Sequence, residues 1–152
     1  MTDTDLAILR VLQENCSLPL AAISEKVNLS TASCHRRIKS LESNGTIICR
    51  RALLNPHALG LMITGIFMIR LARDTADVDQ RMMISLRRQP NVVACYLVTG
   101  EYDFLLITRF RTAGDYTDYI YSFLDTFREV PIQAYSSSLV VRTLREETRL
   151  PI

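Results

Sequence analysis

The apolar residues of this chain change their spacing at Asn55-Pro56, and this change constrains the fold more than any other feature. Before it, apolar side chains recur every three or four positions, as on one face of an α-helix. After it, apolar runs typical of strands alternate with two helical patterns. Because Asn-Pro followed by Gly60 is typical of a connection, the sequence predicts domains at residues 1–54 and 62–152, with a linker at 55–61.

The first 45 residues predict three helices with a short turn between the second and the third. The first is capped by Asp3 or Thr4 and ends near Asn15, the second begins at Pro19, and the third is capped by Ser30 and ends at Asn44-Gly45. This is the order of a helix-turn-helix, whose third helix enters the major groove of DNA. The β-prone run at 46–54 predicts a wing beside that helix.

The predicted third helix has an apolar side and an opposite side of small, polar and basic residues. An ordinary surface helix shows the same pattern, but the short helix and turn before it favour DNA binding. We expect the residues at the start of the helix to meet base edges or nearby phosphates, and the later cations to contact the backbone. The predicted DNA-binding residues are Ser30, Thr31, Ser33, Arg36, Arg37, Lys39, Ser40, Arg50 and Arg51.

The positive charge of the chain is concentrated in this region. The formal net charge is only +2, from 18 basic and 16 acidic side chains, which excludes a histone-like polycation. Residues 1–60 hold seven basic side chains, five of them between positions 36 and 51, whereas the rest of the chain is charge-balanced. Any general attraction for double-stranded DNA therefore comes from the third helix and the wing.

The second half predicts the element order β-α-β-β-α-β, the signature of a ferredoxin-like sandwich. The fold class is therefore α+β, with a winged helix-turn-helix domain joined to this sandwich. The predicted strands are 62–71, 92–98, 104–110 and 132–143, and the predicted helices are 77–89 and 114–127.

The sheet of this sandwich is predicted to be apolar on both faces. Helices cover one face, yet Met62, Ile66 and Met68 lie on the other side of the first strand, and the run 92–98 is apolar on both sides. A two-sided strand without a function is the alternative, but large exposed apolar patches are rare on monomers. We therefore expect a homodimer that forms through the sheets.

Catalytic, metal and membrane functions find little support. No candidate nucleophile lies near a histidine, and no glycine-rich phosphate loop is present, so we expect no catalytic residues. The acidic start and the absence of a run of roughly 18 apolar residues argue against a signal peptide and a membrane span, which favours the cytoplasm. The wide spacing of the cysteines indicates neither zinc nor disulfides, although thiol sensing by Cys34 or Cys95 is an alternative to burial.

Several motifs taken together, in order and along the whole chain, resemble the leucine-responsive/asparagine-regulator (Lrp/AsnC, feast/famine) family of prokaryotic transcriptional regulators. They include the runs 5–13, 36–48, 52–60 and 99–106. The resemblance implies a dimeric DNA-binding regulator, usually assembled into octamers, whose C-terminal domain senses an amino acid; no other cofactor is expected. The helix start 31–35 is particular to this chain, so the operator sequence stays open. The alternatives are an effector-independent architectural regulator and a small ferredoxin-like enzyme or enzyme-regulatory module.

The turn 99–103 is the predicted effector site. By itself it is typical of an ordinary hairpin connection. It offers a carboxylate for an ammonium group and accessible backbone N–H groups for a carboxylate, and the resemblance makes these residues the candidates. The predicted effector-binding residues are Thr99, Gly100, Tyr102 and Asp103, with Ser136, Ser137 and Ser138 on the last strand as contacts from a second side.

Overall fold

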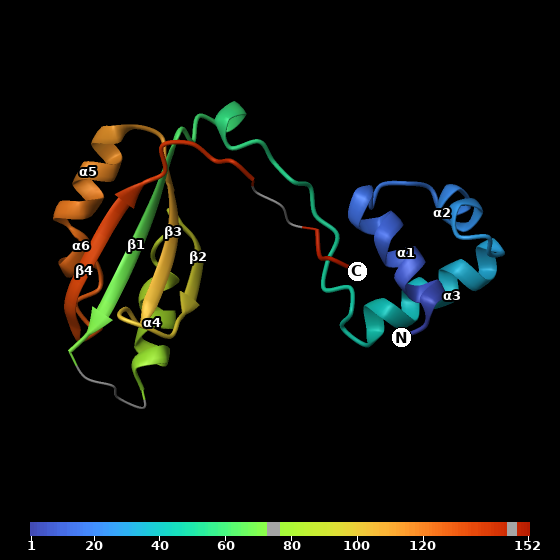
Figure 1. Cartoon of the computed structure of the whole chain (residues 1–152), viewed down its shortest axis with the longest axis horizontal. Coiled ribbons are helices and arrows are strands. Elements are labelled where there is room, and N and C mark those ends of the chain that lie inside the picture. Colours follow the sequence, from blue (N-terminus) through green and yellow to red (C-terminus); the bar gives the residue numbers. More distant parts are fainter. Residues whose placement is uncertain (73–76, 146–148) are drawn as a thin grey trace. The chain divides into compact units, whose positions relative to one another are not determined.

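The computed structural model of the chain describes residues 1–72, 77–145 and 149–152 and divides into two compact units (Figure 1). Unit 1 comprises Met1–Leu53 together with Arg145–Ile152, and unit 2 comprises Leu54–Leu144. The structure thus groups the C-terminal residues, which the sequence assigns to the second domain, with the helical unit.

Unit 1 contains three helices around a small apolar core. They are α1 (Asp3–Glu14), α2 (Leu20–Lys26) and α3 (Thr31–Ser43). The cap of α1 is Thr2 instead of the predicted Asp3 or Thr4, because Thr2 and Asp5 form a capping box in which each satisfies a backbone N–H group of the other. The buried core residues are Ile8, Leu9, Ile23, Cys34, Ile38 and Leu41.

The connection between α2 and α3 is a tight turn, as the sequence predicts. Asn28 adopts a left-handed conformation with φ 52°, which asparagine tolerates better than most residues. The Leu29 N–H group donates to the Ser24 carbonyl at 2.9 Å, and the Ser30 hydroxyl accepts from the Ser33 N–H group at 3.2 Å. The helix-turn-helix of unit 1 is therefore confirmed.

The prediction of a β-strand wing at residues 46–54 is wrong. Residues 46–54 are all described, and none of them forms a strand. The Ile47 N–H group donates to the Leu41 carbonyl at 2.9 Å, which ends α3, and Ile48 and Leu53 are then exposed. A β-prone run forms a strand only where a second strand pairs with it, and unit 1 supplies none to this segment among its described residues.

Unit 2 has the predicted order of strands and helices. Its four strands form one antiparallel sheet in the order β2-β3-β1-β4, which confirms the ferredoxin-like arrangement. The elements are η1 (His57–Leu59), β1 (Ile63–Leu71), α4 (Val78–Leu86), β2 (Val92–Leu97), β3 (Phe104–Phe110), α5 (Ala113–Tyr121), α6 (Phe123–Thr126) and β4 (Ile132–Leu139).

Several boundaries in unit 2 differ from the sequence prediction; α4, predicted over 77–89, ends at Leu86, and two further differences have clear causes. The helix predicted over 114–127 is divided at Ser122, whose hydroxyl donates to the carbonyls of Asp118 and Tyr119 and competes with the helical pattern. The last strand ends at Leu139 because its partner β1 begins at Ile63, and the bond from the Val140 N–H group to the Thr64 carbonyl is the last between the two segments.

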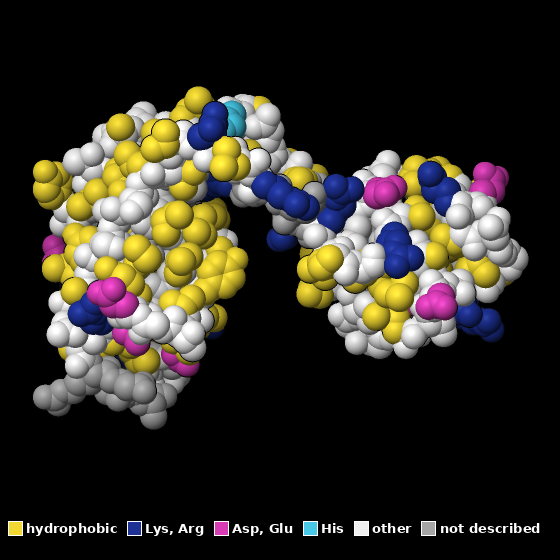
Figure 2. Space-filling view, viewed as in Figure 1, with side chains coloured by type: hydrophobic (Ala, Val, Ile, Leu, Met, Phe, Trp, Pro, Cys, Tyr) yellow, Lys and Arg dark blue, Asp and Glu magenta, His cyan; other side chains and the backbone are white. Residues whose placement is uncertain are grey.

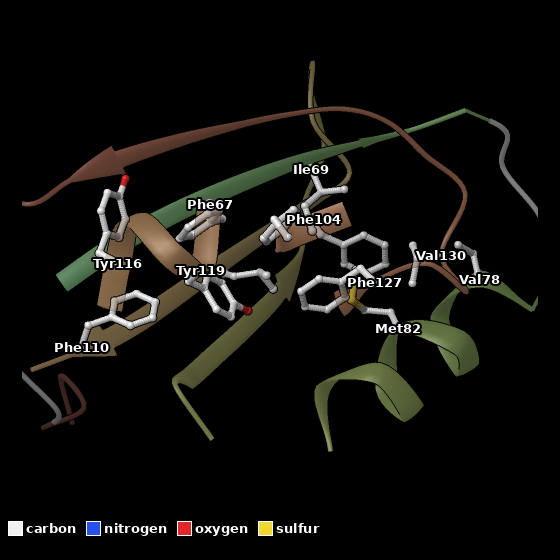
Figure 3. Close-up of a cluster of buried hydrophobic side chains, with 12 residues drawn as sticks. Phe67, Ile69, Val78, Met82, Phe104, Phe110, Tyr116, Tyr119, Phe127 and Val130 are labelled. Atoms are coloured by element: carbon white, nitrogen blue, oxygen red, sulfur yellow. The ribbon is translucent and has the colours of Figure 1, made fainter. Parts of the chain in front are cut away.

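The core of unit 2 lies between the helices and one face of the sheet, and it is rich in aromatic rings (Figure 3). Phe67 of β1 stacks on Phe123 with ring centroids 4.9 Å apart. Gly65 lets α5 approach this face, because a Cβ atom there would lie 2.6 Å from Thr108 Oγ1 and 2.9 Å from the Tyr116 ring. The Thr108 hydroxyl instead donates to the Gly65 carbonyl at 2.9 Å.

The other face of the sheet, which we call the open face, carries no helix of this unit among the described residues. Burial alternates along β1 and β3, and the strand register shows which positions of the neighbouring strands share a face with their less buried residues. Figure 2 shows hydrophobic side chains gathered on unit 2 in the region where Figure 1 labels β2 and β3. The apolar residues of the open face are Ile66, Met68, Ala94, Tyr96, Leu105 and Ile107.

Candidate functional site

The outward face of α3 carries most of the residues predicted to bind DNA. Cys34, Ile38 and Leu41 are buried on the inner side of the helix. Ser33 and Arg37 are half-buried, so the reach of these two toward a duplex is shorter than that of the exposed residues. The exposed members of the predicted set are Ser30, Thr31, Arg36, Lys39, Ser40, Arg50 and Arg51.

Arg37 is engaged inside unit 1. Its Nη1 atom lies 2.8 Å from Asp5 Oδ1 and 3.3 Å from the Thr2 hydroxyl, so it joins α3 to the start of α1. Hydrogen bonds from the Thr2 backbone and hydroxyl, followed by the Arg37 guanidinium, lower the pKa of Asp5 to about 2. Arg37 thus has a positioning role for α3, and its contact with a phosphate stays a prediction.

Glu42 holds two of the other predicted cations. Its Oε2 atom accepts from Lys39 Nζ at 2.9 Å, and its Oε1 atom accepts from Arg50 Nη2 at 2.9 Å. The hydrogen bond from Lys39 is the main cause that lowers the pKa of Glu42. This carboxylate therefore offsets part of the positive charge beside α3, an effect that sequence reasoning missed because Arg50 is eight residues away.

Arg36 and Arg51 are the cations of this surface that keep their charge uncompensated. Both side chains are exposed, and no acidic partner lies within ion-pair distance of either among the described residues. A guanidinium in this state is available to a guanine edge or a phosphate.

The predicted effector turn is tied to the end of β1. Asp103 Oδ2 accepts a hydrogen bond from the Leu71 N–H group at 2.7 Å, and the Asp103 N–H group donates to the Ile69 carbonyl at 2.8 Å. Gly100 has φ 124°, a conformation that favours glycine, and nothing lies within 4 Å of a Cβ atom built there. Thr99 is exposed beside it.

Arg70 joins this turn and was missed by sequence reasoning. Its guanidinium lies 5.6 Å from the centroid of the Tyr102 ring, donates to the Glu101 carbonyl at 3.2 Å and forms an ion pair with the Glu101 carboxylate. Since Arg70 precedes the turn by about thirty positions, only the pairing of β1 with β3 brings it there. It adds a guanidinium, the group best suited to a carboxylate, to the candidate site.

The three serines of β4 divide between the two faces of the sheet. Ser136 pairs with Met68 and Ser138 with Ile66 on the open face, whereas Ser137 pairs with Phe67 on the helix-covered face. Ser136 is diagonal to Arg70 across the strand pair, and its Oγ atom is buried with no hydrogen-bond partner among the described residues. Ser136 is therefore the serine placed nearest the turn with a free hydroxyl.

The described residues bear on three further properties, namely metal binding, membrane insertion and thiol reactivity. No group of three or more His, Cys, Asp or Glu side chains among them could hold a metal ion, and none of the helices they form is long and apolar enough to cross a membrane. Burial raises the pKa of the Cys95 thiol to about 11 and also raises that of Cys34. Both groups are protonated at neutral pH, which weighs against a thiol-sensing role.

The sequence matches two known domain families in the same order as the two units. Residues 1–42 match the AsnC-type helix-turn-helix domain, and residues 64–150 match the Lrp/AsnC ligand binding domain. This chain belongs to the Lrp/AsnC family. It is a transcriptional regulator with a DNA-binding helix-turn-helix and an Lrp/AsnC ligand-binding domain.

Relatives of the Lrp/AsnC regulator cover nearly its whole length. The glutamate uptake regulatory protein of Zymomonas mobilis is 32% identical over 152 residues, which cover 100% of this chain and 91% of the relative. The DNA-binding transcriptional activator DecR of Escherichia coli is 30% identical over 149 residues, which cover 97% and 96%.

Solved structures of the family share the fold. A transcriptional regulator from Neisseria meningitidis in complex with L-Met superposes with a TM-score of 0.90 at 32% identity, covering 99% of this chain and 96% of that one. An AsnC family regulator from Agrobacterium tumefaciens also gives a TM-score of 0.90, at 31% identity, covering 99% and 97%.

Proposed function

We propose that this protein reads a specific operator and that a free amino acid modulates its DNA binding or its assembly. The observation that carries the DNA half is the outward face of α3, where small polar side chains surround Arg36 and no acidic partner neutralises it among the described residues. A face of this kind can approach base edges closely while a guanidinium contacts a guanine.

The DNA-binding residues fall into two groups in this proposal. Ser30, Thr31, Ser33 and Arg36, at the start of α3, meet base edges or nearby phosphates. The backbone is contacted by cations and a serine further along, namely Arg37, Lys39, Ser40, Arg50 and Arg51. A symmetric dimer presents two copies of this face, so the operator is a pseudo-palindrome with half-sites about one helical turn, or a multiple, apart.

The effector site of the proposal is the turn 99–103 with β1 and β4 beside it. A free amino acid needs an acceptor for its ammonium group and donors for its carboxylate. Asp103 and the hydroxyls of Thr99 and Ser136 are acceptors, whereas the backbone at Gly100 and the guanidinium of Arg70 are donors. Tyr102, Ser137 and Ser138 complete the candidate set, and the L-Met complex of the Neisseria relative supports this class of ligand.

The open face supports assembly through the sheets. Three neighbouring strands, β2, β3 and β1, contribute apolar residues to the middle of this face, and Tyr96 is 55% exposed in a single chain. Pairing two such faces would remove this surface from water, which is the main driving force for association. Sedimentation should show a dimer or a larger assembly that Ile107→Glu dissociates and that Val93→Glu, at the exposed edge of β2, leaves intact.

A gel-shift experiment with DNA from upstream of its own gene tests the DNA half. Arg36→Ala should weaken specific binding by roughly 1–3 kcal/mol if the side chain contacts a guanine. Arg88→Ala, which removes an exposed cation from unit 2, is the matched control and should leave affinity unchanged. Equal affinity of both variants would remove Arg36 from the reading surface, and no specific shift with the unaltered protein would favour the enzyme-module alternative.

Calorimetry with the twenty amino acids tests the effector half. Binding of one of them, lost in Asp103→Ala, would support the proposed site. An absence of binding below millimolar concentration, together with a specific gel shift, would favour the effector-independent architectural regulator instead.

A further inference from the structure

The C-terminal residues of the chain bind to α1 through their backbone. The side-chain amide of Gln13 pairs with both backbone groups of Leu150: Gln13 Nε2 donates to the Leu150 carbonyl at 3.3 Å, and the Leu150 N–H group donates to Gln13 Oε1 at 2.6 Å. One turn earlier on α1, Arg10 Nε donates to the Ile152 carbonyl at 2.8 Å. Three hydrogen bonds therefore hold a segment more than 130 positions away in the sequence.

This contact depends mainly on the main chain. The Leu150 side chain remains 69% exposed and that of Ile152 remains 37% exposed. A primary amide that bonds both the N–H and the carbonyl of one residue imitates a neighbouring β-strand, so it selects an extended backbone rather than a side chain. Since none of residues 149–152 belongs to the buried core of unit 1, the segment can leave α1 without unfolding the unit.

The segment leaves the sensing unit through β4. That strand is at the edge of the sheet and carries Ser136 of the candidate effector site. Directly after it, the Val140 N–H group donates to the Thr64 carbonyl, beside the start of β1. Two covalent connections therefore join the units, one at Leu53–Leu54 and one at Leu144–Arg145. Inside unit 1, the ion pair of Asp5 and Arg37 joins α1 to α3.

We propose that residues 149–152 act as a latch on α1, closed by Gln13 and Arg10, that restricts the motion of the helix-turn-helix against the sensing unit. A chain held at two points loses less freedom when it settles on an operator than a chain held at one, so the closed latch raises operator affinity. The affinity effect rests on the proposed function, whereas the latch itself does not.

Amide exchange in the full-length protein tests the latch. Gln13→Ala keeps a good helix former on α1 and removes two of the three bonds, so exchange of the Leu150 amide should accelerate about fivefold or more, as expected for losing one or more net hydrogen bonds. Glu14→Ala changes the next residue of the same helix, which has no hydrogen bond to residues 149–152 among those described, and should leave that exchange unchanged. Equal exchange in the unaltered protein and Gln13→Ala would overturn the latch.

Operator affinity tests the consequence, and it uses a variant that opens the latch from its other side. Leu150→Pro removes the N–H donor while Gln13 stays in place. Both Gln13→Ala and Leu150→Pro should weaken operator binding several-fold relative to Glu14→Ala, with Arg36 intact. Accelerated amide exchange with unchanged operator affinity would overturn the coupling between latch and affinity but not the latch itself. If the unaltered protein bound no operator, the proposed function would be refuted, and the exchange experiment would still test the latch.

Discussion

Removal of the Arg37 guanidinium should destabilise unit 1 more than it changes the electrostatics of DNA binding. The bond to Asp5 is 2.8 Å long, with side-chain exposures of 33% for Arg37 and 14% for Asp5. Hydrogen bonds between charged groups contribute about 1.5–3 kcal/mol, and partial exposure reduces this to about 1–2 kcal/mol for Arg37→Ala. For a unit of this size the loss corresponds to a fall in Tm of roughly 4–15 °C.

Thermal unfolding followed by circular dichroism measures this loss, and a double-mutant cycle with Asp5→Asn isolates the pair. A coupling energy of about 0.5–2 kcal/mol is expected at pH 7. Because the pKa of Asp5 is lowered to about 2, the contribution of its carboxylate is present above the ordinary value near 4 and is lost as the pH falls toward 2. The difference between the unaltered protein and Asp5→Asn should therefore shrink across this acid window.

The opposite pattern would refute the positioning role of Arg37. If Arg37→Ala unfolded like the unaltered protein while the salt slope of operator binding fell by about 1, the side chain would be a phosphate contact and not a link between α1 and α3.

Three further outcomes are expected. Gly65→Ala should lower the stability of unit 2 by about 1–3 kcal/mol in thermal unfolding. The control Gly114→Ala, whose added Cβ atom would lie 3.5 Å from its nearest neighbour, should leave the stability unchanged. Similar stability of the two variants would contradict the close approach of α5. Glu42→Gln should raise operator affinity and steepen its salt dependence, because it releases two cations, and an unchanged gel-shift titration would count against this reasoning. A thiol reagent at neutral pH should modify exposed Cys49 before Cys95. Mass spectrometry of the modified peptides measures the order, and earlier modification of Cys95 would contradict the prediction.

Local patterns were enough to predict most of the fold. The cap at Ser30, the spacing of apolar residues on α3 and the strand of Phe104–Phe110 depend on neighbours within a few positions, and the structure has them as the sequence predicts. The wing is the instructive failure, because the β-prone run at 46–54 needs a partner strand that its own composition cannot reveal.

The candidate site was less predictable because its additional members are distant in sequence. Arg70 reaches Tyr102 only after β1 and β3 pair, and Arg37 meets Asp5 only after α1 packs on α3. A charged residue at a helix surface has the same local pattern whether it faces a phosphate or a carboxylate of its own chain. Sequence reasoning therefore missed the contacts that compensate these charges, and the DNA-binding role of the surface stays a prediction.

The aromatic packing beneath the sheet has a consequence for how this protein can change. Because Phe67, Phe123 and the residues around Gly65 hold the helices on one face, the fold depends little on which side chains occupy the opposite face. Exchanges on the open face, for example at Ser136 and Ser138, should then cost folding little, and under the proposed function they would alter ligand preference or assembly. The sheet separates the residues that maintain the structure from those that can diversify it.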